Sequence, residues 1–245
     1  MRRWRVHEPR AAAGEPEILL SEEESHHLVR VLRSSAGDHV GVFDGHGREW
    51  DAEILGFDGA AVRVRLGDEL DDPVDPPVEI TLVQGWCRAE RFEWILEKGT
   101  EVGISVFQPV WTERSERHRG RVRADRWRRI VVEASKQSGR RVVPSVRPPV
   151  ELDPGSVDAP VRMTLDPTGD PGAIDRAIGR GRPISAALAV GPEGGFSPDE
   201  LAAFERHGWE RVRLGPRILR VETAGPVAAA IILHAWDDRG RPAIA

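Results

Sequence analysis

Two patterns of hydrophobic and polar residues divide the chain. Before residue 70, short apolar runs stand close together and are separated by glycine-rich turns; they cover His39–Phe43, Glu49–Leu55 and Ala61–Leu66. Runs of this length and spacing predict the strands of a small β-barrel or half-open sheet. A helix is predicted ahead of them. Ser21 is its N-cap, Glu24 completes an S-x-x-E capping box, and the apolar stripe is formed by Leu28, Val31 and Leu32.

After residue 78 strands and helices alternate. Strands are predicted at Val78–Gln84, Ser105–Val110, Val161–Leu165 and Ile184–Val190. Helices are predicted at Ala89–Val102, from Asp125 to the residue before Gly139, at Pro198–His207 and at Pro226–Trp236. This alternation is typical of a mainly parallel sheet covered by helices. The last helix is apolar on more than one face, which indicates burial in the domain or in a subunit interface.

The segment D-E-L-D-D-P-V-D-P-P at Asp68–Pro77 separates the two patterns. Its three prolines and its acidic residues replace any periodic apolar pattern, as is typical of a linker. We therefore expect one domain at residues 1–70, a linker at 71–77 and a second domain at 78–245.

Two loops of the second domain carry unusual sequences. G-P-E-G-G-F-S-P-D-E (Gly191–Glu200) and L-G-P-R-I-L-R-V-E-T-A (Leu214–Ala224) each follow an apolar run. Ser197, Pro198 and Glu200 form a helix start with a capping box. The glycines before them are not needed for capping, and glycines so close together indicate left-handed backbone or a close approach of the backbone to something else. Because ligands bind at the carboxyl ends of strands in open α/β sheets, the two loops predict the walls of one small-molecule site.

Charge is unevenly distributed along the chain. The formal net charge is −5, which by itself does not indicate a nucleic-acid partner. Glu113–Arg141, however, holds eleven Lys and Arg against four Asp and Glu, whereas residues 1–72 hold nine against sixteen. A solvated face is one interpretation of this basic strip, and contact with RNA phosphates is the one that we favour.

The sequence gives no support to disulfide-rich, metal-binding, membrane-spanning or common nucleotide-binding and hydrolase classes of protein. One cysteine, Cys87, excludes an internal disulfide framework and fits a reducing compartment. The histidines form no H-x-x-x-H pair, and G-x-S-x-G, Walker A and G-x-G-x-x-G sequences are missing from the places where they would carry function. Arginines near the N-terminus precede no apolar run, and no segment approaches membrane-spanning length. We therefore expect a cytoplasmic protein with no metal and no membrane partner.

Four segments of the second domain resemble one family. They are E-K-G-T-E-V-G (Glu97–Gly103), E-A-S-K-Q-S-G-R (Glu133–Arg140) and the two glycine-containing loops. Together they resemble the ribosomal RNA small subunit methyltransferase E family, the 16S rRNA uridine N3-methyltransferases of the SPOUT superfamily. H-H-L-V-R-V-L-R-S-S-A-G-D (His26–Asp38) is similar to the PUA-like RNA-binding domain of that family.

The resemblance implies an α/β fold in which a SPOUT trefoil-knot domain with a mainly parallel sheet follows a small β-barrel PUA-like domain. It also implies S-adenosylmethionine as the cofactor, a homodimer, and uridine N3 of 16S rRNA, within the assembled small ribosomal subunit, as the target. Knotted backbones are so rare that no pattern of residues would suggest one.

The resemblance also implies which residues act. Arg220 would orient the uracil or stabilise its developing charge, and Glu222 would be the base or a structural partner of Arg217 or Arg220. The cofactor-binding residues implied are Gly191, Glu193, Gly194, Leu214, Gly215, Ile218, Leu219, Arg220, Thr223 and Ala224. The RNA-binding residues expected are His26, Arg30, Arg33, Arg88, Arg91, Arg114, Arg117 and Arg140.

Some residues depart from the family pattern. Val221 replaces a threonine before E-T-A, Gly225 and Pro226 stand where helix formers are usual, and Arg88 replaces a lysine. None of these changes touches the loop glycines. Two alternatives stay open at this point: a SPOUT methyltransferase that acts on another RNA, and a non-catalytic RNA-binding factor of ribosome assembly.

Overall fold

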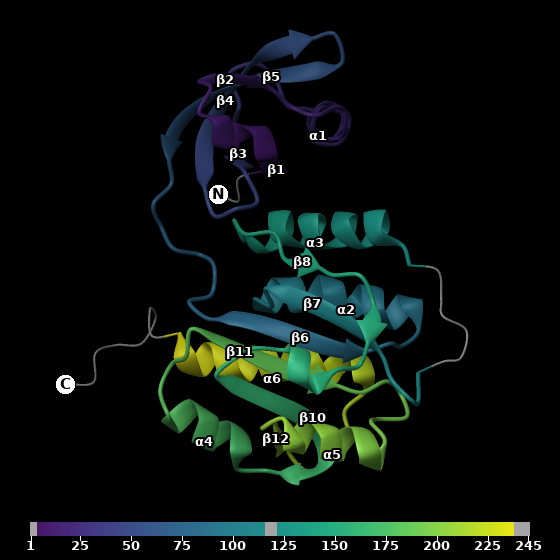
Figure 1. Ribbon diagram of the computed structural model, residues 1–245. Helices are drawn as coiled ribbons and strands as arrows, with labels where there is room; N and C mark the ends of the chain where they lie inside the picture. The colour runs from purple at the N-terminus through teal and green to yellow at the C-terminus, as the bar shows by residue number, and fades with distance from the viewer. Residues whose placement is uncertain (1–3, 116–121, 238–245) are drawn as a thin grey trace, which may run out of the picture. The chain divides into compact units, whose positions relative to one another are not determined.

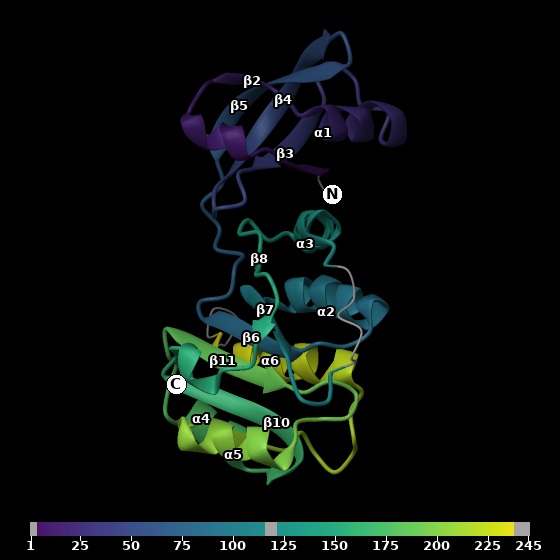
Figure 2. The same cartoon turned by 45° about the vertical axis from the view of Figure 1, so that its right-hand side comes forward.

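A computed structural model describes residues 4–115 and 122–237, which form two compact units (Figure 1, Figure 2). The N-terminal unit consists of Met1–Asp75 and Ser135–Val143, and the C-terminal unit of Pro76–Ala134 and Pro144–Ala245. This division differs from the predicted boundaries, because residues 71–75 of the expected linker and residues 135–143 belong to the N-terminal unit.

The N-terminal unit contains a mixed sheet of five strands in the order β1-β3-β4-β5-β2. Only β1 and β3 run parallel; the other pairs are antiparallel. The three predicted strands are confirmed, and two short strands were not predicted. The bounds are β1 Arg5–His7, β2 Glu17–Leu19, β3 His39–Phe43, β4 Glu49–Asp58 and β5 Ala61–Glu69.

The predicted helix of this unit is partly wrong. Ser21 accepts a hydrogen bond from the Glu24 N–H, as expected, but its own N–H donates to Glu8. Helix α1 (Glu22–His26) passes directly into a π-helical turn, η2 (His27–Val31). A π turn has more residues per turn than an α-helix, so it shifts the apolar phase. Leu28 is therefore buried, whereas Val31 is 61% exposed.

Buried ion pairs attach residues 135–143 to the sheet of the N-terminal unit. Arg5 and Arg141 contact the Glu49 carboxylate at 2.8 and 3.2 Å, and Arg140 contacts Asp75 at 3.1 Å. Burial lowers the pKa of Arg140, although the hydrogen bond to Asp75 opposes the shift. Removing one partner of a buried pair costs about 3–5 kcal/mol, so these contacts stabilise the unit strongly.

The C-terminal unit contains a seven-stranded sheet in the order β12-β10-β11-β6-β7-β8, with β9 paired to β7. All of these pairings are parallel, which confirms the predicted sheet. Its strands are β6 Glu79–Gly85, β7 Val106–Trp111, β8 Ser145–Val146, β9 Val150–Glu151, β10 Val161–Asp170, β11 Ser185–Val190 and β12 Glu210–Val212.

Helices cover both faces of this sheet. Successive residues of a strand point to opposite faces. Leu82 of β6 lies against Gly225 of helix α6 (Val221–Trp236), which also packs on α2 (Ala89–Val102), whereas Val83 belongs to a core with Phe204 of α5 (Pro198–Arg206). Two further helices are α3 (Ala124–Ser138), in which the division between the units falls, and α4 (Ala173–Gly179).

Helix α6 begins five residues earlier than predicted. Proline usually marks a helix start, but here Pro226 lies inside the helix. Val221 and Gly225 are buried, and a Cβ at Gly225 would lie 3.0 Å from the Leu82 side chain. Packing against the sheet thus extends the helix ahead of the proline and places Glu222, Thr223 and Ala224 in its first turns.

No helix in the part of the chain that the structure describes is long and apolar enough to cross a membrane.

Candidate functional site

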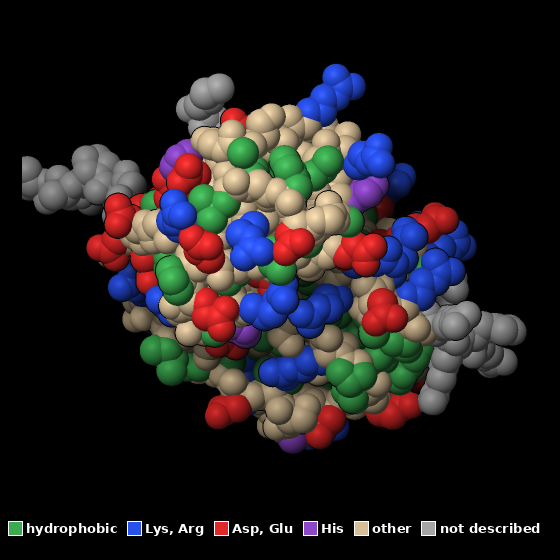
Figure 3. Space-filling model, turned by 90° about the horizontal axis from the view of Figure 1, so that it is seen from above, with side chains coloured by type: hydrophobic (Ala, Val, Ile, Leu, Met, Phe, Trp, Pro, Cys, Tyr) green, Lys and Arg blue, Asp and Glu red, His purple; other side chains and the backbone are tan. Residues whose placement is uncertain are grey.

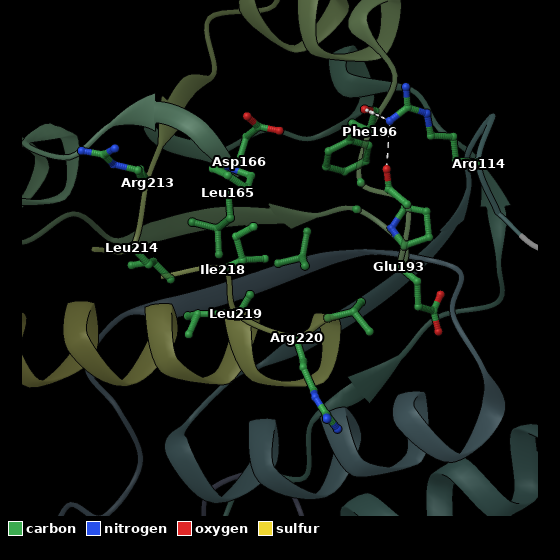
Figure 4. Close-up of a pocket in the computed structure, with 18 of the residues that line it drawn as sticks. Arg114, Leu165, Asp166, Glu193, Phe196, Arg213, Leu214, Ile218, Leu219 and Arg220 are labelled. Carbon is green, nitrogen blue, oxygen red and sulfur yellow. Dashed lines mark hydrogen bonds between the residues drawn. The ribbon is translucent and has the colours of Figure 1, made fainter. Parts of the chain in front are cut away.

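A cavity of about 620 Å³ lies at the carboxyl ends of β11 and β12 and beside the neighbouring part of β10 (Figure 4). Three segments form most of its lining: Leu165–Pro167 of β10, where its pairing with β11 ends, Val190–Phe196 from the last residue of β11, and Val212–Val221 from the last residue of β12. Because neighbouring strands of this sheet are parallel, their carboxyl ends meet at one edge, where α/β proteins bind ligands. We call residues 191–197 the first loop and residues 213–220 the second loop.

The first loop folds back on itself in a way that requires glycine. A Cβ at Gly191 would lie 2.7 Å from the carbonyl carbon of Gly195, and one at Gly85 of β6 would lie 2.6 Å from Pro192. Gly195 has φ of +69°, which favours glycine. The glycines therefore allow close backbone approach, as the sequence predicted.

Side chains outside the first loop hold it in place. The Arg114 guanidinium donates to the carbonyl oxygens of Gly194 and Phe196 at 2.8 and 3.2 Å, as Figure 4 shows. Ser197 and Glu200 form the predicted capping box, with both reciprocal hydrogen bonds present. Phe196 is buried, so the loop is anchored on the core as well as by polar contacts.

The second loop is far more exposed. Ile218 is 84% exposed, and the Arg220 side chain is 80% exposed. Gly215 has φ of +67°, and Arg220 is the N-cap residue of α6. In Figure 4 the Arg220 side chain points away from the cavity that its backbone helps to line.

An ion cluster lies at one edge of the cavity. Arg91 of α2 contacts Glu193 at 3.2 Å and Glu222 at 3.8 Å, and Arg220 lies 3.9 Å from Glu222. The Glu222 side chain is only 16% exposed, and its Oε2 is buried without a hydrogen-bond partner. A buried carboxylate oxygen without a hydrogen-bond partner is unusual in a protein.

Cys87 lies beside this cluster. Burial and the nearby charge of Glu193 raise the pKa of its thiol to about 12. The thiol therefore stays protonated at neutral pH and is a poor nucleophile.

Most of the predicted cofactor residues come together. Those that line the cavity are Gly191, Glu193, Gly194, Leu214, Ile218, Leu219, Arg220 and Ala224. Gly215 and Thr223 are adjacent in sequence to residues of the lining but are not part of it. Glu222 lies behind the lining, where it contacts two residues that do line the cavity, Arg91 and Arg220.

The predicted RNA-binding residues separate into several places. Arg91 and Arg114 line the cavity, and the Arg88 N–H donates to Glu193. Arg140 is 5% exposed and paired with Asp75, so the geometry gives no support to an RNA contact there. His26, Arg30 and Arg33 are exposed on the N-terminal unit. Arg117 lies outside the described residues.

The part of β10 beyond its pairing with β11 was missed by sequence reasoning. Leu165, Asp166 and Pro167 form a third wall of the cavity. Asp166 Oδ1 accepts hydrogen bonds from the N–H and the hydroxyl of Thr168, which fixes the carboxylate in place. The signal was present as D-P-T-G directly after an apolar run, but it contains a single glycine.

Among the described residues, no group of three or more His, Cys, Asp or Glu side chains is arranged to hold a metal ion.

Comparison with known families defines the class of protein. Residues 74–233 match the family of RNA methyltransferase domains, and residues 20–66 match the RNA methyltransferase PUA domain. The fold, the cavity at the strand ends and these matches together define an RNA methyltransferase with an N-terminal PUA domain.

Similar individual proteins show to which family of RNA methyltransferases the chain belongs. Ribosomal RNA small subunit methyltransferase E of Synechocystis is 33% identical over 89% of this chain and 73% of its own length. The protein of that name from Mycobacterium tuberculosis is 34% identical, over 88% of this chain and 86% of its own. The crystal structure of the Neisseria gonorrhoeae protein of that name, bound to S-adenosylmethionine, covers 96% of this chain and 98% of its own, with 28% identity and a TM-score of 0.86. The chain belongs to the ribosomal RNA small subunit methyltransferase E family.

Proposed function

We propose that this protein transfers a methyl group from S-adenosylmethionine to N3 of a uridine in 16S rRNA. The observation that carries the proposal is the cavity between the two loops, with Arg220 in its lining and the partly unsatisfied carboxylate of Glu222 behind it. The relatives named for methylation of small-subunit ribosomal RNA, one of them bound to S-adenosylmethionine, support the choice of donor and RNA.

The residues present fit the methyl donor. A cavity of about 620 Å³ lies within the range of about 300–1,000 Å³ found for small-molecule sites. Gly191, Gly194 and Gly195 are part of the lining and present backbone groups, rather than side chains, to this space. Backbone amides and carbonyls of both loops would hold the adenosine and amino-acid parts, and the carboxylates of Asp166 and Glu193 offer acceptors for hydroxyl or ammonium groups.

The donor supplies a methyl group that is already activated on a sulfonium, so the protein must position the reactants and manage one proton. Loss of the N3 proton leaves negative charge on N3 and on the flanking carbonyl oxygens of the uracil. The Arg220 guanidinium, exposed beside the cavity, would orient the base and stabilise that charge. Glu222 Oε2 would accept the proton, while Arg91 and Arg220 hold its carboxylate.

Two experiments test this proposal. Calorimetry should detect binding of S-adenosylmethionine to the purified protein. Mass spectrometry of 16S rRNA from a strain lacking the protein should reveal the loss of one methyluridine. If S-adenosylmethionine did not bind, the assignment of the cavity as its site would be wrong. If the 16S rRNA of the deletion strain were fully modified, the assignment of 16S rRNA as the substrate would be wrong.

We also propose that the protein acts as a homodimer through the outer faces of α2 and α6. Val227 and Ile231 lie one turn apart on α6 and are 37% and 43% exposed, and Trp94 of α2 is 42% exposed. Exposed apolar side chains on packed helices favour a subunit interface. Light scattering should give twice the chain mass, and Ile231→Glu should yield monomers; a monomeric unchanged protein would contradict the dimer.

The assembled small subunit is the proposed form of the substrate, and the cytoplasm is therefore the proposed location. Intact small subunits and free 16S rRNA can be compared directly as substrates. Methylation should be faster on small subunits than on 16S rRNA stripped of protein; a preference for the free RNA would contradict this part of the proposal.

A further inference from the structure

A second hollow, on the N-terminal unit, is not part of the site described above. It is lined mainly by Glu22, Glu23 and His26 of α1, Val29 and Arg30 of η2, and Phe57 near the end of β4, and we call it the Phe57 groove. The Phe57 side chain is 50% exposed, although a large aromatic ring is usually buried. Figure 3 looks down on this unit and shows hydrophobic side chains exposed between charged ones.

Arg30 and Arg33 differ from the other cations of the N-terminal unit. In its described residues, every other Lys and Arg forms an ion pair with a carboxylate; examples are Arg48 with Glu69 and Arg63 with Asp58. Arg30 and Arg33 form none, and both are exposed. Arg30, which lines the groove, and Arg33, three residues further along the chain, are thus available to bind an anionic partner.

The backbone around these two arginines is unusual. Arg30 lies in the π-helical turn η2, and π turns occur frequently at functional sites. Arg33 has φ of +56° and is the one residue other than glycine with positive φ in the described part of the chain. This conformation is costly for a residue with a Cβ, and strain of this kind is concentrated at binding and active sites.

We propose that the Phe57 groove binds one unpaired RNA base, stacked on the Phe57 ring, with the flanking phosphates on Arg30 and Arg33. This inference rests on the proposed function, because it assigns the groove to the same RNA substrate. Aromatic rings bind single-stranded RNA by stacking, and arginines bind its phosphates. Glu22 and Glu23 accept hydrogen bonds from amino groups on the base edge, so the groove prefers adenine or cytosine to uracil.

Binding of short fluorescent single-stranded oligoadenylate and oligouridylate to the full chain, measured by anisotropy, tests the stacking. Phe57→Ala should weaken oligoadenylate binding roughly tenfold, and Phe57→Trp should restore it. Val31→Ala is the control, because Val31 is an exposed apolar residue of η2 that does not line the groove. Unchanged binding by Phe57→Ala, or an equal loss in Val31→Ala, would overturn the assignment.

A matched pair of double variants tests the pairing of arginines with phosphates. Arg30→Ala with Arg33→Ala should weaken binding and reduce the slope of log affinity against log salt by roughly 0.7 for each phosphate that is no longer neutralised. Arg63→Ala with Arg65→Ala removes the same charge from ion-paired arginines of β5, and its salt slope should stay unchanged. Equal effects of the two double variants would overturn the proposal, since they would indicate only a general dependence on charge.

The base preference is tested by Glu22→Gln with Glu23→Gln, which should abolish the preference of oligoadenylate over oligouridylate. If the double variant kept the preference for oligoadenylate, or if the original protein had none, Glu22 and Glu23 would not be what selects the base. Donor binding by calorimetry separates this inference from the proposed function. If Phe57→Ala binds the methyl donor normally but no longer binds oligoadenylate, the base-binding role of the Phe57 groove is supported, whatever RNA the protein methylates.

Discussion

The two loops that line the cavity differ in how they are held. The first loop is fixed by Arg114, by a complete capping box, by the buried Phe196 ring and by backbone approaches that leave no room for a Cβ. The second loop carries exposed side chains, with Ile218 84% exposed. A rigid wall is suited to shaping a binding site, and a wall with exposed cations is suited to meeting a polyanionic substrate. Substitutions in the first loop should therefore affect donor binding, and those in the second should affect methyl transfer.

The largest effect is expected in the second loop. Arg220→Ala should lower the rate of methyl transfer about 10²–10³-fold, because it removes the guanidinium that we propose stabilises the developing charge on the uracil. Donor affinity should change little, since the side chain points away from the cavity. Rates with saturating RNA, together with calorimetry of the donor, measure the two effects. Arg217→Ala, a cation of the same loop, should have a smaller effect; equal losses would contradict the special role of Arg220.

The next effect is expected in the first loop. Gly191→Ala places a Cβ 2.7 Å from backbone that cannot move freely, and overpacking of this kind costs about 1–3 kcal/mol. Donor affinity should fall accordingly. At Gly194 a Cβ would meet only the Arg114 side chain, at 3.5 Å, so Gly194→Ala serves as the control. If both variants bound the donor equally, the close approach would not be what shapes the site.

A smaller loss is expected for Arg114→Ala. Two charge-assisted hydrogen bonds to the first loop disappear, and each contributes about 1.5–3 kcal/mol when well shielded but less at this partly exposed position. Donor binding should weaken and the loop should become more mobile by hydrogen exchange. Arg114→Lys keeps the charge but cannot form both hydrogen bonds in the same geometry. Its affinity for the methyl donor should therefore lie between that of the unchanged protein and that of Arg114→Ala. If Arg114→Ala left donor binding and exchange unchanged, the clamp would be unnecessary.

The smallest effect concerns Cys87, behind the first loop. Because its pKa is raised to about 12, the folded state holds the thiol proton more tightly than the unfolded chain does. The stability that this contributes is complete below about pH 8 and is lost as pH rises through the unfolded value of about 8.5 towards 12. A Cys87→Ser variant should lack this part of the alkaline loss in unfolding experiments.

Cys87 also reports on the difference between the loops. The thiol is 1% exposed, so it should react slowly with alkylating reagents in the unchanged protein. Gly191→Ala should accelerate the reaction, and Ile218→Ser should not, because Ile218 contributes little to packing. Equal rates in all three proteins would show that the first loop does not protect this edge.

Local patterns predicted the regular elements and the loops well. Glycines, capping boxes and apolar runs each act over a few residues, so the longer sheet strands, α2, α5 and the two loops could be predicted from them. The short strands β1, β2, β8 and β9 were not predicted. The resemblance predicted the family, which the comparisons confirm. The knot stays a prediction, as do the catalytic and RNA-binding residues.

The misses arise where distant contacts decide the outcome. The burial of Arg140 could not be predicted, because its partner Asp75 lies 65 positions away. The start of α6 depends on packing against Leu82, and the exposure of Val31 depends on a π turn that no periodic pattern indicates. The Asp166 wall was overlooked because only the strand order places it beside the two loops.

The most direct test of the central claim is methylation in a defined system. Small ribosomal subunits from a strain lacking the protein would be incubated with the purified protein and S-adenosylmethionine, and nucleosides of the 16S rRNA would be identified by mass spectrometry. We predict that one N3-methyluridine appears with the unchanged protein and is nearly absent with Arg220→Ala. No new methylated nucleoside, or methylation at another atom, would contradict the account.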